Sequence, residues 1–353
     1  MDLREGMISY GARSTASRNA RCSSARATSQ PSRCHARRMN PSSISPDRLE
    51  HLRHLEAHLA EQIRGQDHVL PRVASVLHRG ELGLAPRSRP RGSFLFLGPT
   101  GVGKTELTIA FTRYLAGHDK LFRFDMSEYQ TQDSLGLLLG GKLGEVGLLG
   151  LTVAKSATGT LPFDEIEKAH PRVLDVFLQV LDAARVTMAN GEALDLSGFY
   201  IVFTSNLGAA ELLNLQHSSF TTMERHVLTK AQRSLRPELY ARISEKIVFS
   251  RLSYDVQLDI ARLHIGRELA LLRGRGFDLV TDETVVSFLI QRGFHPRLGA
   301  RPLRDAVEKY LRGAVADALL AEVSLHRGEF VVCGGELLLR PSQRTVPTVA
   351  IGG

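Results

Sequence analysis

The residues best suited to chemistry form the run GPTGVGKT, which follows the apolar run Ser93 to Leu97. The run satisfies the pattern G-x-x-x-x-G-K-[ST] of a phosphate-binding loop. Its glycines let backbone N–H groups turn inward around an anion, a lysine supplies a point charge to the β- and γ-phosphates, and a hydroxyl can ligate Mg²⁺. We therefore expect ATP and Mg²⁺ as cofactors. The expected nucleotide-binding residues are Gly98, Pro99, Thr100, Gly101, Val102, Gly103, Lys104 and Thr105, the last also a metal ligand.

Two carboxylates end a second apolar run, Leu161 to Phe163. Asp164 is expected to hold Mg²⁺ through water, and Glu165 to polarise the attacking water as a general base. Asn206 ends a third such run and would place its amide near the γ-phosphate. Because parallel strands deliver their carboxyl ends to one edge of a sheet, the three side chains should meet there. The implied chemistry is hydrolysis of a bound triphosphate.

The surrounding elements alternate between short β-rich runs and segments that can be helical. This alternation favours a parallel sheet covered on both faces, an α/β fold. The expected strands are Ser93 to Leu97, Leu121 to Asp125, Thr158 to Phe163, Phe199 to Ser205 and Lys246 to Phe249. After the first run, apolar residues from Leu107 to Leu115 recur at helical spacing, which places the loop between a strand and a packed helix.

From Ser253 onward the pattern becomes helical, with one long apolar stripe from Leu303 to Leu319 and a possible hairpin at Gly334-Gly335. We expect a small, α-rich C-terminal domain. The expected boundaries are a tail over 1–46, an α/β nucleotide domain over 47–250, an α-rich lid over 251–345 and a flexible end over 346–353.

The formal charge of +8 is unevenly distributed, since eight arginines and two acids in residues 1–40 account for +6. The nearly neutral remainder makes a nucleic-acid partner unexpected. The Ser- and Arg-rich start should be a disordered tail, with Met39 as an alternative initiator; an organellar transit peptide is the other interpretation. Cys333 stands alone outside this tail. A single cysteine and the lack of a long apolar run favour a reducing, cytoplasmic compartment and no membrane span.

In this order, the motifs resemble the AAA+ ATPases of the Clp family, above all the second ATPase module of the Clp disaggregases. The resemblance runs from about residue 60 to residue 340. It rests on seven collinear segments: IRGQDHV, FLFLGPTGVGKTELT, FRFDMSEYQ, FDEIEKAHPRVLDVFLQVLD, IVFTSNLGA, LRPELYARISEKIVF and LGARPLRDAV.

The resemblance implies roles for further residues. Asn206 corresponds to the polar sensor, Arg242 to the arginine finger offered to a neighbouring subunit's nucleotide, and Arg301 to the sensor on the lid. Ile63 and Gly65 would line the adenine pocket. His170, just before Pro171, is expected to be a helix-entry residue and not a catalytic one.

The sequence departs from the Clp pattern at several points. Where threading Clp ATPases have an aromatic pore-loop residue, Gly141 to Gly144 presents Lys142. Pro162 falls inside an expected central strand, where its missing N–H should distort the strand or weaken hydrolysis. No Ile-Gly-Phe or Ile-Gly-Leu tripeptide lies between Asn206 and Arg236, so a peptidase partner is unsupported.

The leading functional hypothesis is an ATP-hydrolysing protein remodeller, an unfoldase or chaperone that acts as a ring, expected to be a homohexamer, on polypeptide substrates. The alternative is an ATP-dependent assembly switch that binds one dedicated partner without threading; Lys142 and Pro162 favour it. A third hypothesis, a nucleic-acid motor, would depend on the basic tail.

Overall fold

The computed structural model describes residues 44–141, 145–214, 218–295, 298–321 and 327–341. Residues 1–43 of the predicted tail, the pore-loop residue Lys142 and the segment 346–353 therefore lie outside the described residues. The domain boundaries remain predictions, although α1 begins at Pro46, β7 ends at Val248 and α11 begins at Tyr254.

A five-stranded parallel sheet carries the N-terminal part, with strand order β2-β3-β6-β1-β7. Its strands are β1 (Gly92–Leu97), β2 (Phe124–Asp125), β3 (Gly159–Asp164), β6 (Phe199–Ser205) and β7 (Glu245–Val248). Around it lie α1 (Pro46–Arg53), α2 (Leu55–Gln62), α3 (Leu70–Glu81), α4 (Lys104–Ala116), α5 (Ser134–Leu139), α6 (Leu148–Lys155), α7 (Pro171–Ala183), α8 (Ala209–Asn214), α9 (Phe220–Ser234) and α10 (Pro237–Arg242). Short elements complete it: η2 (His118–Lys120), η3 (Met126–Glu128), η4 (Ile166–Lys168), β4 (Arg185–Thr187) and β5 (Ala193–Asp195).

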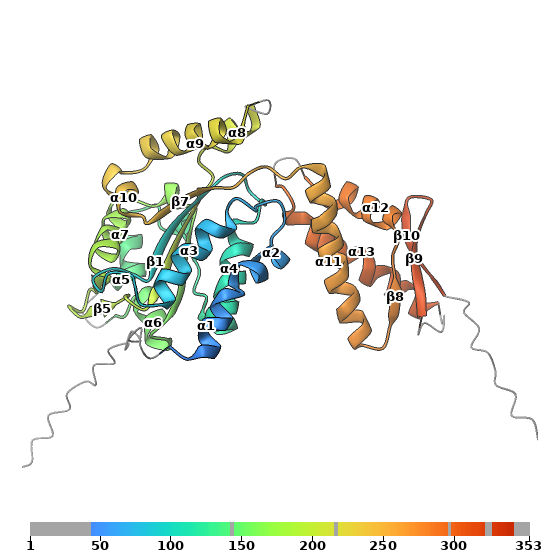
Figure 1. The fold of residues 1–353 in the computed structure, drawn as a ribbon, viewed down its shortest axis with the longest axis horizontal. Coiled ribbons are helices and arrows are strands. Elements are labelled where there is room, and N and C mark those ends of the chain that lie inside the picture. The colour runs from blue at the N-terminus through green and yellow to red at the C-terminus, as the bar shows by residue number, and fades with distance from the viewer. Residues whose placement is uncertain (1–43, 142–144, 215–217, 296–297, 322–326, 342–353) are drawn as a thin grey trace, which may run out of the picture. The chain divides into compact units, whose positions relative to one another are not determined.

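Successive side chains along each strand point to opposite faces of the sheet, so the hydrophobic core is divided into two clusters, one on each face. On β1, Leu95 and Leu97 join the cluster beneath α7, α9 and α10, whereas Phe94 and Phe96 join the cluster beneath α2, α3 and α4. Figure 1 shows the same division, with α7 and α10 on one side of the sheet and α3 and α4 on the other. Both faces are buried, as expected for parallel strands that read as continuous apolar runs.

Pro162 does not interrupt its strand, because β3 keeps a regular register with β6 from Gly159 to Phe163. The N–H of Phe122 donates to the Thr160 carbonyl at 3.0 Å, so Thr160 turns its backbone groups toward β2. Backbone groups two residues apart face the same side of a strand, and Pro162 therefore faces β2 as well. β2 pairs with β3 only at Phe163 and Asp164, so the proline displaces no bond to β6. The expected distortion is absent from this strand.

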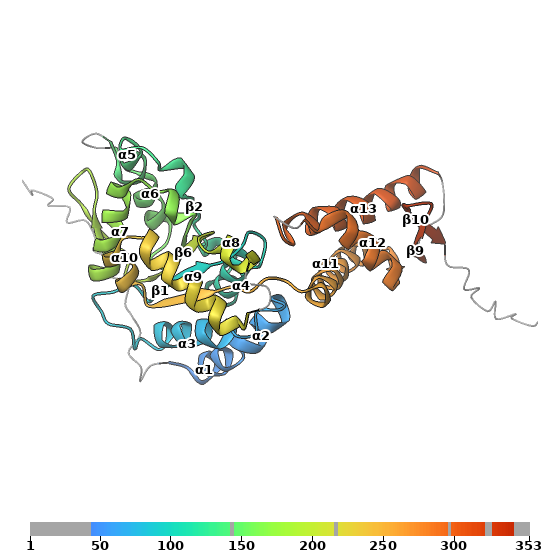
Figure 2. The ribbon, with the colours of Figure 1, turned by 90° about the horizontal axis from the view of Figure 1, so that it is seen from above.

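The C-terminal part is a helical unit with a small sheet (Figure 2). It comprises α11 (Tyr254–Gly274), β8 (Asp278–Val280), α12 (Glu283–Gly293), α13 (Arg301–Leu320), β9 (Arg327–Cys333) and β10 (Glu336–Pro341). The hairpin predicted at Gly334-Gly335 is confirmed as the antiparallel pair β9 and β10. The stripe on α13 is buried from Leu303 to Ala318 except at Tyr310, which is half-buried, whereas Leu319 is 48% exposed.

Asp282 caps α12 and offers a measurable contribution to stability. Its Oδ1 accepts the N–H of Thr284 at 3.0 Å and that of Val285 at 3.1 Å. The pKa of Asp282 is lowered, first by the Thr284 hydroxyl and then by the Val285 N–H. We expect Asp282→Ala to lower the free energy of unfolding by about 1 kcal/mol at pH 7, the usual value of such a cap.

The effect of Asp282→Ala should depend on pH. A carboxyl whose pKa is lower in the folded chain stabilises it above the unfolded-state value, and this contribution is lost as pH falls through the folded-state pKa. The difference from wild type should therefore shrink below about pH 4. Urea unfolding followed by circular dichroism measures it. Asp282→Asn is the control, since its amide oxygen caps at every pH; equal losses in both variants would contradict the capping argument.

Candidate functional site

The predicted phosphate loop lies between β1, which ends at Leu97, and α4, which begins at Lys104. Gly101 and Gly103 have φ angles of +75° and +109°, in the region that favours glycine. A Cβ at Gly101 would lie 2.0 Å from the carbonyl oxygen of Leu298, so no larger residue fits. The loop therefore delivers backbone N–H groups to the start of α4, where the helix dipole favours an anion.

Lys104 is buried within this loop. Its ammonium group donates to the carbonyls of Gly98 and Pro99 at 2.5 and 2.9 Å and to Oδ1 of Asn206 at 3.0 Å. Burial lowers the pKa of Lys104 to about 8, against the opposing charges of Glu167, Asp164 and Glu165. A desolvated ammonium gains strongly from an anionic partner, and this favours a phosphate at the site.

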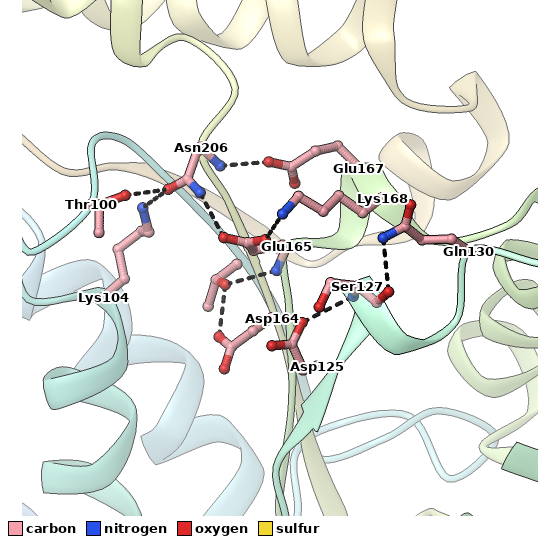
Figure 3. Close-up of polar contacts among 11 residues, drawn as sticks. Thr100, Lys104, Asp125, Ser127, Gln130, Asp164, Glu165, Glu167, Lys168 and Asn206 are labelled. Carbon is pink, nitrogen blue, oxygen red and sulfur yellow. Dashed lines mark hydrogen bonds and ion pairs between the residues drawn. The ribbon is translucent and has the colours of Figure 1, made fainter. Parts of the chain in front are cut away.

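Asp164 and Glu165 leave the end of β3, as predicted (Figure 3). Asp164 is 4% exposed; its Oδ1 accepts the Thr204 hydroxyl at 2.7 Å, and its Oδ2 forms an ion pair with Arg123. Glu165 has a φ of +57°, a conformation that side-chain-bearing residues rarely adopt. Such local strain is typical of functional positions.

Asn206, just beyond β6, joins the loop to these carboxylates. Its Oδ1 accepts from Lys104, and its Nδ2 donates to Oε1 of Glu165 at 3.2 Å. Its backbone N–H donates to Oε1 of Glu167 at 3.0 Å. Figure 3 shows these bonds as one connected network. The structure thus brings together the loop, the two carboxylates and the amide that the sequence had placed on separate strands.

A cavity of about 400 Å³ opens beside this network, within the size range of small-ligand sites. Thr105 and Asp164 both line it. Their hydroxyl and carboxylate oxygens are the hard donors that Mg²⁺ takes, usually with several waters, so these residues fit a magnesium site. No group of three or more His, Cys, Asp and Glu side chains suited to a metal occurs among the residues that the structure describes.

The other predicted ligands lie in different places. Ile63 and Arg301 line the cavity, whereas Gly65 and Arg242 are not among its lining residues. Gly65 has a φ of +69°, and a Cβ there would lie 2.5 Å from Val256, so packing accounts for this glycine. His170 caps α7, with its Nδ1 accepting the N–H of Arg172, as expected for a helix-entry residue.

Arg242 ends α10 and is directed to an acidic partner of its own chain. Its Nε donates to Oδ2 of Asp182 on α7 at 2.6 Å, and its side chain is 34% exposed. The guanidinium therefore lies at the surface and outside the cavity of its own chain. This placement is compatible with a role at another subunit's site.

Comparison with known proteins adds to this geometry. Residues 89–246 match the family model of the AAA domain (Cdc48 subfamily), and residues 252–332 match the C-terminal, D2-small domain of ClpB protein. The chain belongs to the Clp-family AAA+ ATPases. Its α/β domain and its helical D2-small domain correspond to the fold that the sequence predicted.

Three curated relatives illustrate the similarity. Chaperone protein ClpB 2 of Nostoc sp. is 39% identical over 80% of this chain and 32% of its own length. Chaperone protein ClpB of Aquifex aeolicus is 37% identical over 82% of this chain and 31% of its own length. Heat shock protein 100 of Trypanosoma brucei brucei is 38% identical over 79% of this chain and 33% of its own length. This Clp-family chain thus spans about a third of the length of each.

The Clp-family site contains three charged residues to which the sequence analysis gave no role there: Arg123, Glu167 and Lys168. Arg123 pairs with Asp164, Glu167 holds the backbone of Asn206, and Lys168 pairs with Glu165. The partner of Arg123 is Asp164 and that of Glu167 is Asn206, and each partner comes from a different segment of the chain. Residue spacing within one segment therefore could not indicate these contacts.

No helix in the described parts of the chain is long and apolar enough to cross a membrane.

If Asp164 holds Mg²⁺, its ion pair with Arg123 would compete with the metal, and this competition can be tested. We expect Arg123→Gln to lower the Mg²⁺ concentration needed for half-maximal ATP hydrolysis about threefold. Asp164 is buried, but the Arg123 side chain is 49% exposed, so the pair is worth only a fraction of a kcal/mol. A magnesium titration measures the shift. Arg113→Gln, an exposed arginine on α4, is the control. A higher Mg²⁺ requirement in Arg123→Gln would show instead that Arg123 supports the metal site.

Proposed function

We propose that this chain hydrolyses ATP with Mg²⁺ and uses the energy to remodel polypeptides as a ring of identical subunits. The observation that carries the hydrolytic part is the network of Lys104, Asn206 and Glu165 beside one cavity. It joins a phosphate-binding group, a polar sensor and a carboxylate base, as hydrolysis of a bound triphosphate requires.

Each residue has a distinct part in the proposed reaction. Lys104 and Arg301 would hold phosphate oxygens, and Thr105 and Asp164 would hold Mg²⁺, which neutralises charge on the phosphates. Water attacks the γ-phosphorus, the bond to the β-phosphate oxygen breaks, and ADP leaves. Glu165 would accept the proton of the attacking water, and Asn206 would orient that water. Ile63, on the cavity wall, would contact the adenine.

The ring follows from the proposed role of Arg242. This guanidinium is not among the residues that line its own chain's cavity, so in the proposed role it would act on the phosphate of a neighbouring subunit. Such head-to-tail contacts form a ring when the rotation between subunits closes, and a hexamer is the proposed form. The relatives named chaperones support a polypeptide substrate. We propose neither a peptidase nor a nucleic acid as a partner.

The assembly switch remains the second candidate, with one observation in its favour. Both carboxylates at the end of β3 carry a basic partner, Asp164 with Arg123 and Glu165 with Lys168. A site at rest in this state could bind ATP without turning it over. Pro162 no longer supports the switch, since β3 is regular there.

Steady-state phosphate release by the full chain, with ATP and Mg²⁺, tests the proposal. The size of the assembly is recorded on the same samples by light scattering. Lys104→Ala is the matched variant, which should lose nucleotide binding and turnover together because the ammonium contacts the loop directly. Turnover that depends on Lys104, in a closed oligomer, supports the motor. Binding of ATP without turnover by wild type would favour the switch.

A further inference from the structure

Lys168 forms an ion pair with Glu165, the proposed general base (Figure 3). The pair involves Oε2 of Glu165, while Oε1 accepts from Asn206. Both oxygens of the carboxylate are therefore engaged by groups of the same chain. These two contacts fix the orientation of the carboxylate and occupy two of its roughly four lone-pair sites.

The backbone brings the two side chains together. Glu165 adopts the left-handed conformation, and its carbonyl accepts the N–H of Lys168 at 2.9 Å. This tight turn, η4, returns the lysine to the carboxylate three residues earlier. The Lys168 side chain is 48% exposed, so its ammonium group can leave without a large change in solvation.

We propose that Lys168 is a latch, a positioning residue that holds Glu165 away from water until nucleotide occupies the phosphate loop. The inference rests on the proposed hydrolysis of ATP. It assigns to this chain a built-in restraint on the basal rate, separate from the groups that bind phosphate.

The contacts of Asn206 connect the latch to the loop. When Lys104 exchanges Asn206 for a phosphate oxygen, the amide of Asn206 loses the donor that fixes its Oδ1. The remaining donor to that oxygen is the Thr100 hydroxyl, at 3.4 Å. The amide can then turn toward the phosphate, and Glu165 loses one of its two restraints.

The charge of Asp125 also acts on Lys168. The pKa of Lys168 is raised, first by the hydrogen bond to Glu165 and further by the charges of Glu165, Asp125 and Glu167. The Asp125 carboxylate is exposed and is held by the N–H of Ser127 at 2.9 Å. A lysine released from Glu165 therefore keeps an acidic neighbour.

Turnover by Lys168→Met tests the latch, because methionine keeps the length of the side chain and removes its charge. We expect kcat to rise about three- to fivefold, the range that an exposed ion pair supports. KM and the dissociation constant for a fluorescent ATP analogue should stay within twofold of wild type. Lys168→Arg should restore the wild-type rate, and Lys309→Met on α13 controls for the loss of an exposed lysine.

A second readout does not depend on turnover. Acylation of Lys168 by an amine-reactive ester, measured by mass spectrometry, should become several-fold faster when a non-hydrolysable ATP analogue is bound. Lys309 provides the internal control. An unchanged acylation rate would mean that nucleotide does not release the lysine, and the latch would be rejected.

The remaining outcomes separate the latch from the proposed function. If wild type hydrolyses ATP but Lys168→Met is slower, Lys168 orients the base, and the latch is overturned. An unchanged rate overturns it too. If wild type and Lys168→Met bind nucleotide and neither hydrolyses it, the proposed hydrolysis fails and the latch fails with it, because a freed base should act.

Discussion

Glu165→Gln is expected to reduce kcat for ATP hydrolysis at least 100-fold while nucleotide binding stays within about threefold of wild type. A glutamine keeps the size of the side chain and can still accept the hydrogen bond from the Asn206 amide, but it cannot take a proton from water. Loss of a general base usually costs between 10²- and 10⁴-fold. Phosphate release and the affinity for a fluorescent ATP analogue, measured on the same preparation, give both quantities.

Glu128→Gln provides the matched control, since Glu128 is an exposed carboxylate on η3 outside the cavity lining. Its turnover should equal that of wild type. The proposed mechanism would be wrong if Glu165→Gln retained more than a tenth of the wild-type rate. Weak nucleotide binding in Glu165→Gln would show that the substitution disturbs the loop, and Asn206 would be the first contact to examine.

The parts of the site that the sequence predicted are those with local signals. The phosphate loop needs glycines at fixed spacing between a strand and a helix, and β1 and α4 begin and end close to the expected residues. Likewise, an apolar run that ends in two acids identified the end of β3. Edge strand β2 was predicted from Leu121 but contains only Phe124 and Asp125, beyond an isolated bridge from Leu121 to Thr160.

What the sequence could not predict depends on which groups meet across strands. A proline inside a strand removes one N–H donor, so the sequence suggested a distorted strand at Pro162. Whether the strand is distorted depends on which neighbouring strand the missing N–H would face, and that side is set by the strand pairing. Arg123 was not assigned to the site because its partner, Asp164, lies on the neighbouring strand. Lys168 lies within a segment that was already recognised, yet its contact with Glu165 requires the left-handed turn at Glu165.

Mixing two inactive variants should restore hydrolysis if Arg242 acts across a subunit interface. Arg242→Ala alone is expected to lose about 10³-fold in kcat, the lower range for an arginine finger. In a mixed ring, a subunit with Arg242→Ala keeps Glu165 and can receive Arg242 from a neighbour that carries Glu165→Gln. For an equal mixture of independent subunits, half of the subunits keep the base and half of these have a suitable neighbour, giving about a quarter of the wild-type rate.

The mixture distinguishes a finger in trans from every role of Arg242 within its own chain. Phosphate release is measured after the variants are mixed and reassembled, with each variant alone and with an equal mixture of Glu165→Gln and Arg233→Ala as references. Arg233 is an exposed arginine on α9. Failure to exceed the single variants would place the effect of Arg242 in its contact with Asp182, that is, in the packing of α10 on α7. Recovery requires that one complete site be built from two chains, because neither variant contains both Glu165 and Arg242.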